Sequence, residues 1–311
     1  MHPFPNRPIG AAGLLLAASL LAASASAQTA GGEGLSPTLA NIKRTHVVRL
    51  GYRESSPPFS FLDHSNRPIG YSLELCEAIV EEIGVEVDDA NLKVEYVKVT
   101  SDDRIPAVTE NKIDLECGST TNNLERQKQV AFTITHFVTA NRFVSKKSAN
   151  LQTVDDLKGK TVVSTSGTTN IKQITEIGAQ KGLNLNILAA KDHAEAFLMV
   201  ETGRAAAFVM DDILLYSLVA ASKSPKDYAI SNDALSVEPY GIMLRRDDPS
   251  FKKVVDEAMI ATYKSGAINP IYEKWFLKPI PPKGINLNVP VSDAFKKVIA
   301  SPTDSGDPAV Y

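Results

Sequence analysis

The chain contains only two cysteines, Cys76 and Cys117, in 311 residues. No His or Cys spacing resembles a metal site, so neither a metal nor any other cofactor is expected. The two cysteines can pair in an oxidising compartment. Two separate buried thiols are an equally good interpretation, because Cys76 falls on the apolar face of a predicted helix and Cys117 at a strand end. The sequence leaves both states open.

Long apolar runs are also missing after the N-terminus. Arg7 precedes the apolar stretch 11–23, and small residues follow up to Ala27. This stretch is shorter than the roughly 20 residues that span a bilayer. The pattern is typical of a secretory signal peptide over residues 1–27, and no cysteine stands at its cleavage site to accept a lipid. We therefore expect a freely diffusing, soluble protein of a bacterial periplasm.

The chain has no excess of positive charge. Without residues 1–27, which carry one arginine and no acid, 32 basic and 36 acidic residues remain, a net charge of −4. A weakly acidic balance argues against nucleic acid and anionic membranes as partners. The remaining length suits one large domain or two lobes, and we expect a monomer.

Sequence repeats and low-complexity tracts are lacking too; instead, strand and helix patterns alternate. This alternation predicts an α/β architecture that binds ligands at the carboxyl ends of its strands. The predicted strands are 47–54, 94–99, 113–117, 161–164, 185–188, 205–210 and 240–244. The predicted helices are 104–111, 170–181 and 194–202, with others that begin at Ser72 and Pro249 and an apolar helical face over 271–276.

The segment from Cys117 to Arg126 narrows the function furthest. Ser119 and Thr121 place hydroxyl groups at alternate positions, and the guanidinium of Arg126 follows five residues later. An α-amino acid needs acceptors for its ammonium group and a planar two-pronged cation for its carboxylate. The pattern therefore predicts a site for an α-amino acid.

Four motifs in a fixed order resemble those of family 3 periplasmic solute-binding proteins of ABC transporters, above all members that bind glutamate and aspartate. The resemblance runs from about Ile42 to Ser292. The motifs are Arg53-Glu54-Ser55-Ser56-Pro57-Pro58-Phe59-Ser60, Ser119-Thr120-Thr121 with Arg126, Ser166-Gly167-Thr168-Thr169, and Phe208-Val209-Met210-Asp211-Asp212.

The resemblance implies a type II fold of two α/β lobes that close on a ligand in the cleft between them. Two hinge strands would lie near 139–144 and 238–244. Lobe 1 would then comprise 42–139 and 241–300, and lobe 2 would comprise 140–240. The Pro-rich turn from Pro279 and the polar end of the chain predict a flexible surface tail over 301–311.

By resemblance, Arg126 pairs with the ligand α-carboxylate, helped by Thr121 and by the turn that contains Thr169. Asp211 and Ser119 receive the α-ammonium group. An alternative places Arg126 on a solvated face. Another makes Asp211 or its neighbour Asp212 the N-cap of the helix from Ile213, most simply with one residue in each role.

Arg53 and Arg104, with Ser101 and His193 as further contacts, are the candidates that recognise the ligand side chain. Three arginines against Asp211 leave a charge of +2, which favours glutamate or aspartate over a neutral amino acid. Arg104 at the surface is an alternative, as is His193 as a helix cap. The sequence does not separate glutamate from aspartate.

These observations predict a non-enzymatic carrier that captures L-glutamate or L-aspartate and delivers it to an ABC transporter permease in the inner membrane. The alternative is a periplasmic enzyme on the same scaffold, such as a dehydratase of cyclic dicarboxylates. Such an enzyme needs a general acid. Glu54 and Glu116 are the candidates, but both are more simply interpreted as solvated or loop-pairing carboxylates.

Overall fold

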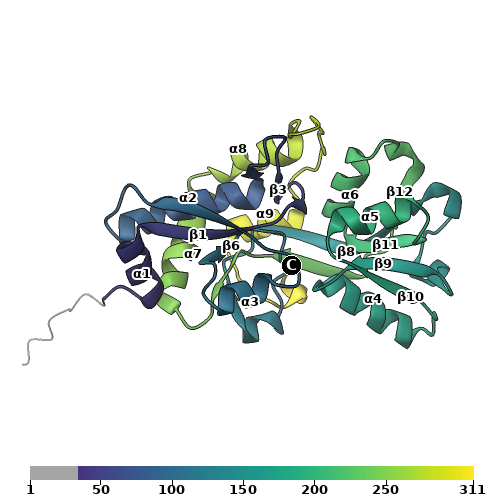
Figure 1. Ribbon diagram of the computed structural model, residues 1–311, viewed down its shortest axis with the longest axis horizontal. Helices are drawn as coiled ribbons and strands as arrows, with labels where there is room; N and C mark the ends of the chain where they lie inside the picture. Colours follow the sequence, from purple (N-terminus) through teal and green to yellow (C-terminus); the bar gives the residue numbers. More distant parts are fainter. Residues whose placement is uncertain (1–33) are drawn as a thin grey trace, which may run out of the picture. The chain divides into compact units, whose positions relative to one another are not determined.

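The structure, a computed structural model, describes residues 34–311 (Figure 1). The predicted signal peptide, residues 1–27, lies outside this range. Among the described residues, no helix is both long enough and apolar enough to cross a membrane. Residues Leu35–Tyr311 form one unit that contains two large sheets.

The first sheet, on which lobe 1 is built, has the strand order β5-β1-β6-β14-β7. β1 runs parallel to β5 and β6, whereas β14 runs antiparallel to β6 and β7. A small sheet of β2, β3 and β4 lies in the same lobe. The strands are β1 Val47–Tyr52, β2 Ser55–Ser56, β3 Ser60–Leu62, β4 Pro68–Ile69, β5 Lys93–Lys98, β6 Leu115–Glu116, β7 Val130–Phe132 and β14 Met243–Arg245.

Figure 1 shows α2 above and α3 below the strands β1 and β6. Helix α2 buries the apolar residues predicted from its spacing, and it packs against α7. The side chain of Asp248 accepts a hydrogen bond from Phe251 N (3.0 Å) and so caps α7, as the sequence predicts. The helices of lobe 1 are α1 Pro37–Thr45, α2 Tyr71–Glu86, α3 Arg104–Thr109, α7 Pro249–Lys264, α8 Ile268–Tyr272 and α9 Asp293–Ala300.

The second sheet, on which lobe 2 is built, has the order β10-β9-β11-β8-β12, and β13 also pairs with β8. β9 runs parallel to β10 and β11, and β8 is antiparallel to its neighbours. The strands are β8 Phe137–Lys146, β9 Thr161–Thr165, β10 Asn186–Ala190, β11 Ala207–Asp211, β12 Tyr228–Ile230 and β13 Ser236–Tyr240. The helices are α4 Thr169–Gln180, α5 His193–Glu201 and α6 Asp212–Ala221.

The chain crosses between the two sheets along β8 and β13, which pair from Phe137 with Tyr240 to Asn141 with Ser236. The sequence predicts one strand over 240–244, but β13 ends at Tyr240 and β14 begins at Met243 in the other sheet. The strand breaks at Gly241, where a Cβ atom would lie 3.1 Å from the Phe132 side chain. The absence of a side chain there lets the backbone change sheets.

A disulfide joins Cys76 on α2 to Cys117, which follows β6. The interpretation of these residues as two separate thiols is therefore wrong, and the pairing interpretation is confirmed. The next residues, Gly118 and Ser119, lead from β6 toward the lobe interface. The disulfide thus ties the segment that carries Ser119 and Thr121 to α2.

The C-terminal segment 301–311 does not lie free, contrary to the flexible tail expected from its composition. The carbonyl of Thr303 accepts a hydrogen bond from Thr135 N (2.8 Å). The carbonyl of Asp304 accepts from Asn122 Nδ2 (2.8 Å) and Gln127 Nε2 (2.9 Å). Polar side chains of lobe 1 therefore hold this segment through its backbone, which composition does not indicate.

Candidate ligand-binding site

Residues of both lobes line a small cavity. Lobe 1 contributes the segment that follows β6 and the start of α3, and lobe 2 contributes the starts of α4, α5 and α6. Six of the nine predicted site residues lie in this wall. The lining residues are Arg104, Ser119, Thr121, Thr168, Thr169, Asn170, His193, Met210, Asp211 and Leu214.

Arg126 lies beside this cavity and connects the two lobes. Its side chain donates from Nη1 to the Thr121 carbonyl (2.8 Å) and from Nη2 to the Gly167 carbonyl of lobe 2 (3.2 Å). Burial, and next the charge of Arg104, lower the pKa of Arg126 to about 9. Arg126 is only 7% exposed. The solvated-face alternative is therefore wrong.

Two further arginines are buried at the carboxyl end of the lobe 1 sheet. Arg53 directly follows β1 and donates from Nη2 to Ser101 Oγ (2.6 Å). Arg104 opens α3 and donates from Nη1 to Thr120 Oγ1 (2.7 Å). Both arginines are 2% exposed, so the alternative that places Arg104 at the surface is wrong. Burial, and next the charge of Arg104, lower the pKa of Arg53 to about 10.

Asp211 ends β11 and points into the cavity wall, while Asp212 binds elsewhere. Asp211 accepts hydrogen bonds from Asn170 Nδ2 (2.7 Å) and from the Tyr240 hydroxyl. Asp212 accepts from Arg142 Nε (3.1 Å). Asp211 occupies the N-cap position of α6, yet its side chain makes no capping hydrogen bond, and Asp212 lies inside the helix. The expectation that one of the two side chains caps this helix is wrong.

His193 and Thr169 lie at the starts of two helices of lobe 2. The N-cap of α5 is Asp192, whose side chain accepts from Glu195 N (2.9 Å), so the alternative that His193 caps this helix is wrong. His193 Nδ1 lies 2.8 Å from Thr165 Oγ1. Burial, and next the charges of nearby arginines, hold the pKa of His193 well below its usual value. Its ring is therefore neutral at pH 7.

Residues 48–278 match the family model of bacterial extracellular solute-binding proteins, family 3. The chain belongs to this family. It is 50% identical to the L-glutamate/L-aspartate-binding protein of Pseudomonas aeruginosa over 291 residues, which cover 93% of this chain and 96% of that protein. It is 41% identical to the glutamate/aspartate import solute-binding protein of Escherichia coli, over 94% of this chain and 95% of that protein.

A solved structure of an ancestral arginine-binding protein bound to arginine is also similar, with a TM-score of 0.68 and 29% identity. The alignment covers 74% of this chain and 98% of that structure. The predicted family is therefore confirmed, and so is the predicted type II fold with two lobes and two hinge strands.

Sequence reasoning missed two buried carboxylates in this family 3 site. Glu116 is 0% exposed and Glu238 is 1% exposed, so the interpretation of Glu116 as a solvated or loop-pairing residue is wrong. Glu238 accepts from Thr169 Oγ1 (3.0 Å) and Gln173 Nε2 (2.7 Å). The position of Glu116 between the apolar residues Leu115 and Cys117 is a signal that points to it, whereas no comparable pattern marks Glu238.

These carboxylates change the charge balance of the family 3 site. Three arginines face three carboxylates, so the charge of +2 expected from sequence is wrong for the whole site. The local balance differs. Among the nearby carboxylates, Glu116 has the largest influence on the pKa values of Arg53 and Arg104. Asp102, Asp103, Asp192 and Asp211 act on these arginines more weakly. The two buried guanidiniums therefore have one fully buried carboxylate, Glu116, as their main counter-charge.

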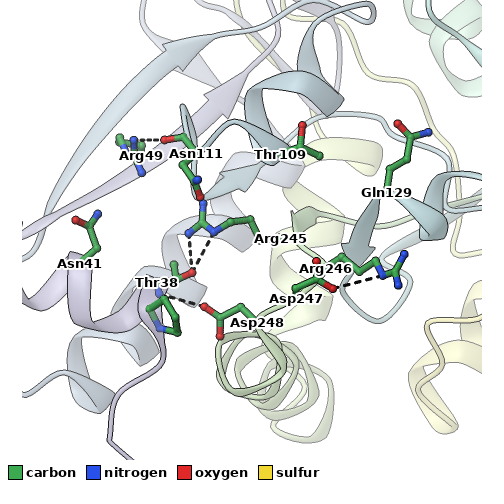
Figure 2. Close-up of a pocket in the computed structure, with 11 residues that line it drawn as sticks. Thr38, Asn41, Arg49, Thr109, Asn111, Gln129, Arg245, Arg246, Asp247 and Asp248 are labelled. Atoms are coloured by element: carbon green, nitrogen blue, oxygen red, sulfur yellow. Dashed lines mark hydrogen bonds and ion pairs between the residues drawn. The ribbon is translucent and has the colours of Figure 1, made fainter.

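A larger hollow of about 1080 Å³, open to solvent, lies elsewhere on lobe 1 (Figure 2). Arg49 of β1 and Arg245 of β14 border it, and both pair with the fully buried Asp114 (2.9 and 3.2 Å). Arg49 lies near the amino end of β1, whereas Arg53 follows its carboxyl end. Family 3 ligands bind between the lobes, and this hollow involves one lobe only.

Proposed function

We propose that this protein captures L-glutamate or L-aspartate in the periplasm and delivers it unchanged to the permease of an ABC transporter. The observation that carries the proposal is a group of three buried arginines: Arg104 lines the cavity between the lobes, and Arg126 and Arg53 lie beside its lining residues Thr121 and His193. In this proposal, the removal of residues 1–27 releases a soluble monomer that works as a carrier and not as an enzyme. The names of its relatives support the ligand class and the transport role.

Each end of the ligand has a matching partner. Arg126 offers the planar fork that suits the α-carboxylate, and Asp211 with Ser119 and Thr121 offers acceptors for the ammonium group. Arg53 and Arg104 take the side-chain carboxylate, with Ser101 and His193 beside them. Thr169 begins α4, so its backbone amide adds a donor for the α-carboxylate.

The side-chain end favours an acid over an amide. A second ligand carboxylate would neutralise the one excess positive charge around Arg53 and Arg104. A glutamine amide would leave this charge buried without a counter-charge, which is unfavourable in a site that excludes water. Glutamate and aspartate differ by one methylene group, worth about 0.8 kcal/mol of burial, so both acids fit the proposal.

Thermal unfolding tests this function. Mature protein, stripped of ligand by unfolding and refolding, is heated with L-glutamate, L-aspartate, L-glutamine or L-asparagine. Ligand at a hundred times its Kd stabilises by about 2.7 kcal/mol, so at equal concentrations the two acids should raise Tm much more than the amides, which bind more weakly. Glutamate recovered after incubation should be unchanged. A shift with the amides alone, or chemical conversion of the ligand, would refute the proposal.

Affinity should also depend on pH through Asp211. Burial, and next the charge of Glu238, raise the pKa of Asp211 to about 7. The ammonium group of the ligand requires Asp211 in its carboxylate form. Below pH 7, the proton bound to Asp211 must therefore leave when the ligand binds. The dissociation constant for glutamate should therefore be about tenfold higher at pH 6 than at pH 8. Calorimetry in buffers of different ionisation enthalpy measures both the affinity and the released proton.

Asp212→Asn is a matched control for this pH dependence, because Asp212 is the adjacent carboxylate and pairs with Arg142 instead. It should keep most of the pH profile, because the charge of Asp212 is the weakest of the five main influences on the Asp211 pKa, whereas Asp211→Asn should weaken binding and flatten the profile. An unchanged profile in Asp211→Asn would contradict the role given to Asp211.

A further inference from the structure

Glu116 is a buried acid at the centre of the lobe 1 sheet. It belongs to β6, and its backbone pairs with Gly51 of β1 on one side and Met243 of β14 on the other. The side chain is fully buried at the carboxyl ends of β1 and β6. A carboxylate in this position is unfavourable unless nearby cations or donors compensate it.

Thr120 connects Glu116 to Arg104. The Thr120 hydroxyl donates to Glu116 Oε2 (2.6 Å), and Arg104 Nη1 donates to Thr120 Oγ1 (2.7 Å). A hydroxyl has one proton, so its donation to Glu116 turns its lone pairs toward Arg104. Glu116 thus fixes the direction in which Thr120 accepts, and thereby the position of the Arg104 guanidinium.

Several buried polar atoms around Glu116 and the two arginines lack a hydrogen-bond partner in the described part of the chain. Within residues 34–311, Glu116 Oε1, Arg53 Nη1, Arg104 Nε and Ser119 Oγ are buried and make no hydrogen bond in the protein. A Cβ atom on Gly118 would lie 2.2 Å from Glu116 Oε1 and 3.1 Å from Arg53 Cγ. Because Gly118 has no Cβ atom, the Glu116 carboxylate can lie beside Arg53.

The charge of Glu116 acts on both arginines. Burial lowers the pKa of Arg104 and of Arg53, and the negative charge of Glu116 raises both values again. The two guanidiniums also repel each other, as the lowering of the Arg53 pKa by Arg104 indicates. Glu116 therefore compensates part of the buried positive charge of these two arginines.

We propose that Glu116 is a positioning residue that sets the specificity of the side-chain end of the cleft. Through Thr120 it aims Arg104 at the ligand, and its charge stabilises the arginine pair and leaves one positive charge for one ligand carboxylate. This inference rests on the proposed capture of acidic amino acids. The positioning of Arg104 raises affinity for the acidic ligand. The negative charge of Glu116 stabilises the ligand-free protein and weakens the attraction for the acidic ligand.

Variants of Thr120 test the positioning. Thr120→Val removes the hydroxyl but keeps the branched shape, and Thr120→Ser keeps the hydroxyl. Calorimetry with stripped protein should show glutamate binding about tenfold more weakly to Thr120→Val. Glutamine affinity should change less than threefold, and Thr120→Ser should restore glutamate affinity. Equal losses for both ligands in Thr120→Val would overturn the positioning role, because general damage to the site affects both.

Glu116→Gln tests the charge, because its amide oxygen can still accept from Thr120. The ligand-free variant should melt at a lower temperature than the parent protein. Glutamate should then raise Tm by more than it does in the parent, since its carboxylate supplies the missing negative charge, while glutamine should not. A smaller glutamate shift than in the parent would overturn the charge role. Failure of the parent to bind any acid would instead refute the proposed function.

Discussion

Arg126→Ala is expected to lose binding of every amino acid, acidic or neutral. Its guanidinium is buried at the lobe interface and contacts both lobes through Thr121 and Gly167. Truncation of one partner of a buried, hydrogen-bonded charge pair costs roughly 2–5 kcal/mol, so affinity should fall by at least about thirtyfold. Titration calorimetry with glutamate and glutamine measures the loss.

Two further variants separate this effect from general damage. Arg126→Lys keeps the charge but not the planar fork, so it should recover only part of the affinity. Arg104→Ala should weaken glutamate much more than glutamine, because Arg104 faces the ligand side chain. Binding of glutamate to Arg126→Ala within a few-fold of the parent would contradict the assignment of the α-carboxylate.

Gly167→Ala is expected to weaken all ligands by tenfold or more, because it obstructs the contact between the lobes. A Cβ atom on Gly167 would lie 2.6 Å from the Ser101 carbonyl oxygen and 2.7 Å from the Asp102 Cα atom of lobe 1. These are backbone atoms that a side-chain rotation cannot move. Ser166 Oγ also donates to Asp102 Oδ1 here (2.9 Å). Closure should therefore become incomplete, with faster ligand release.

Gly159→Ala is the matched control. Gly159 also lies in lobe 2 and has the same φ of +70° as Gly167, but a Cβ atom there would meet nothing within 4 Å. Both variants should lose about 1–2 kcal/mol of stability from the left-handed backbone. Stopped-flow measurements should show faster glutamate dissociation in Gly167→Ala only. Similar dissociation rates in both variants would show that strain, and not the lobe contact, explains the effect.

Local patterns predicted the alternation of strands and helices, but not the helices α1 and α9 or the short strands β7 and β12. The Asp248-Pro249 start of α7 and the apolar face of α2 depend on neighbouring residues only, and both are confirmed. The break at Gly241 could not be predicted, because it depends on the approach of Phe132 from another strand. The contacts of segment 301–311 depend likewise on Asn122 and Gln127, far away in the chain.

In the candidate site, too, some features could be predicted from local sequence and others depend on the fold. The arginines could be predicted from local position, because Arg53 follows a strand, Arg104 opens a helix and Arg126 follows the Ser119-Thr120-Thr121 motif. The charge balance could not, because Glu116 and Glu238 come from a central strand and a hinge strand whose neighbours are set by sheet topology. The position of Asp211 at a strand end, together with the family resemblance, distinguishes it from Asp212 as the expected ligand contact. The raised pKa of Asp211 depends on Glu238, which no local pattern places beside it.

The sequence by itself determined the family, the α/β class and the residue types that suit an α-amino acid, because periodicity and ordered motifs are local properties of the chain. Only the tertiary structure decided the pairing of Cys76 with Cys117, the burial of Glu116 beside two arginines and the contact of Gly167 with Ser101. Each of these joins segments that are distant in sequence. Their energies depend on distance and desolvation, which are defined only once the chain is folded.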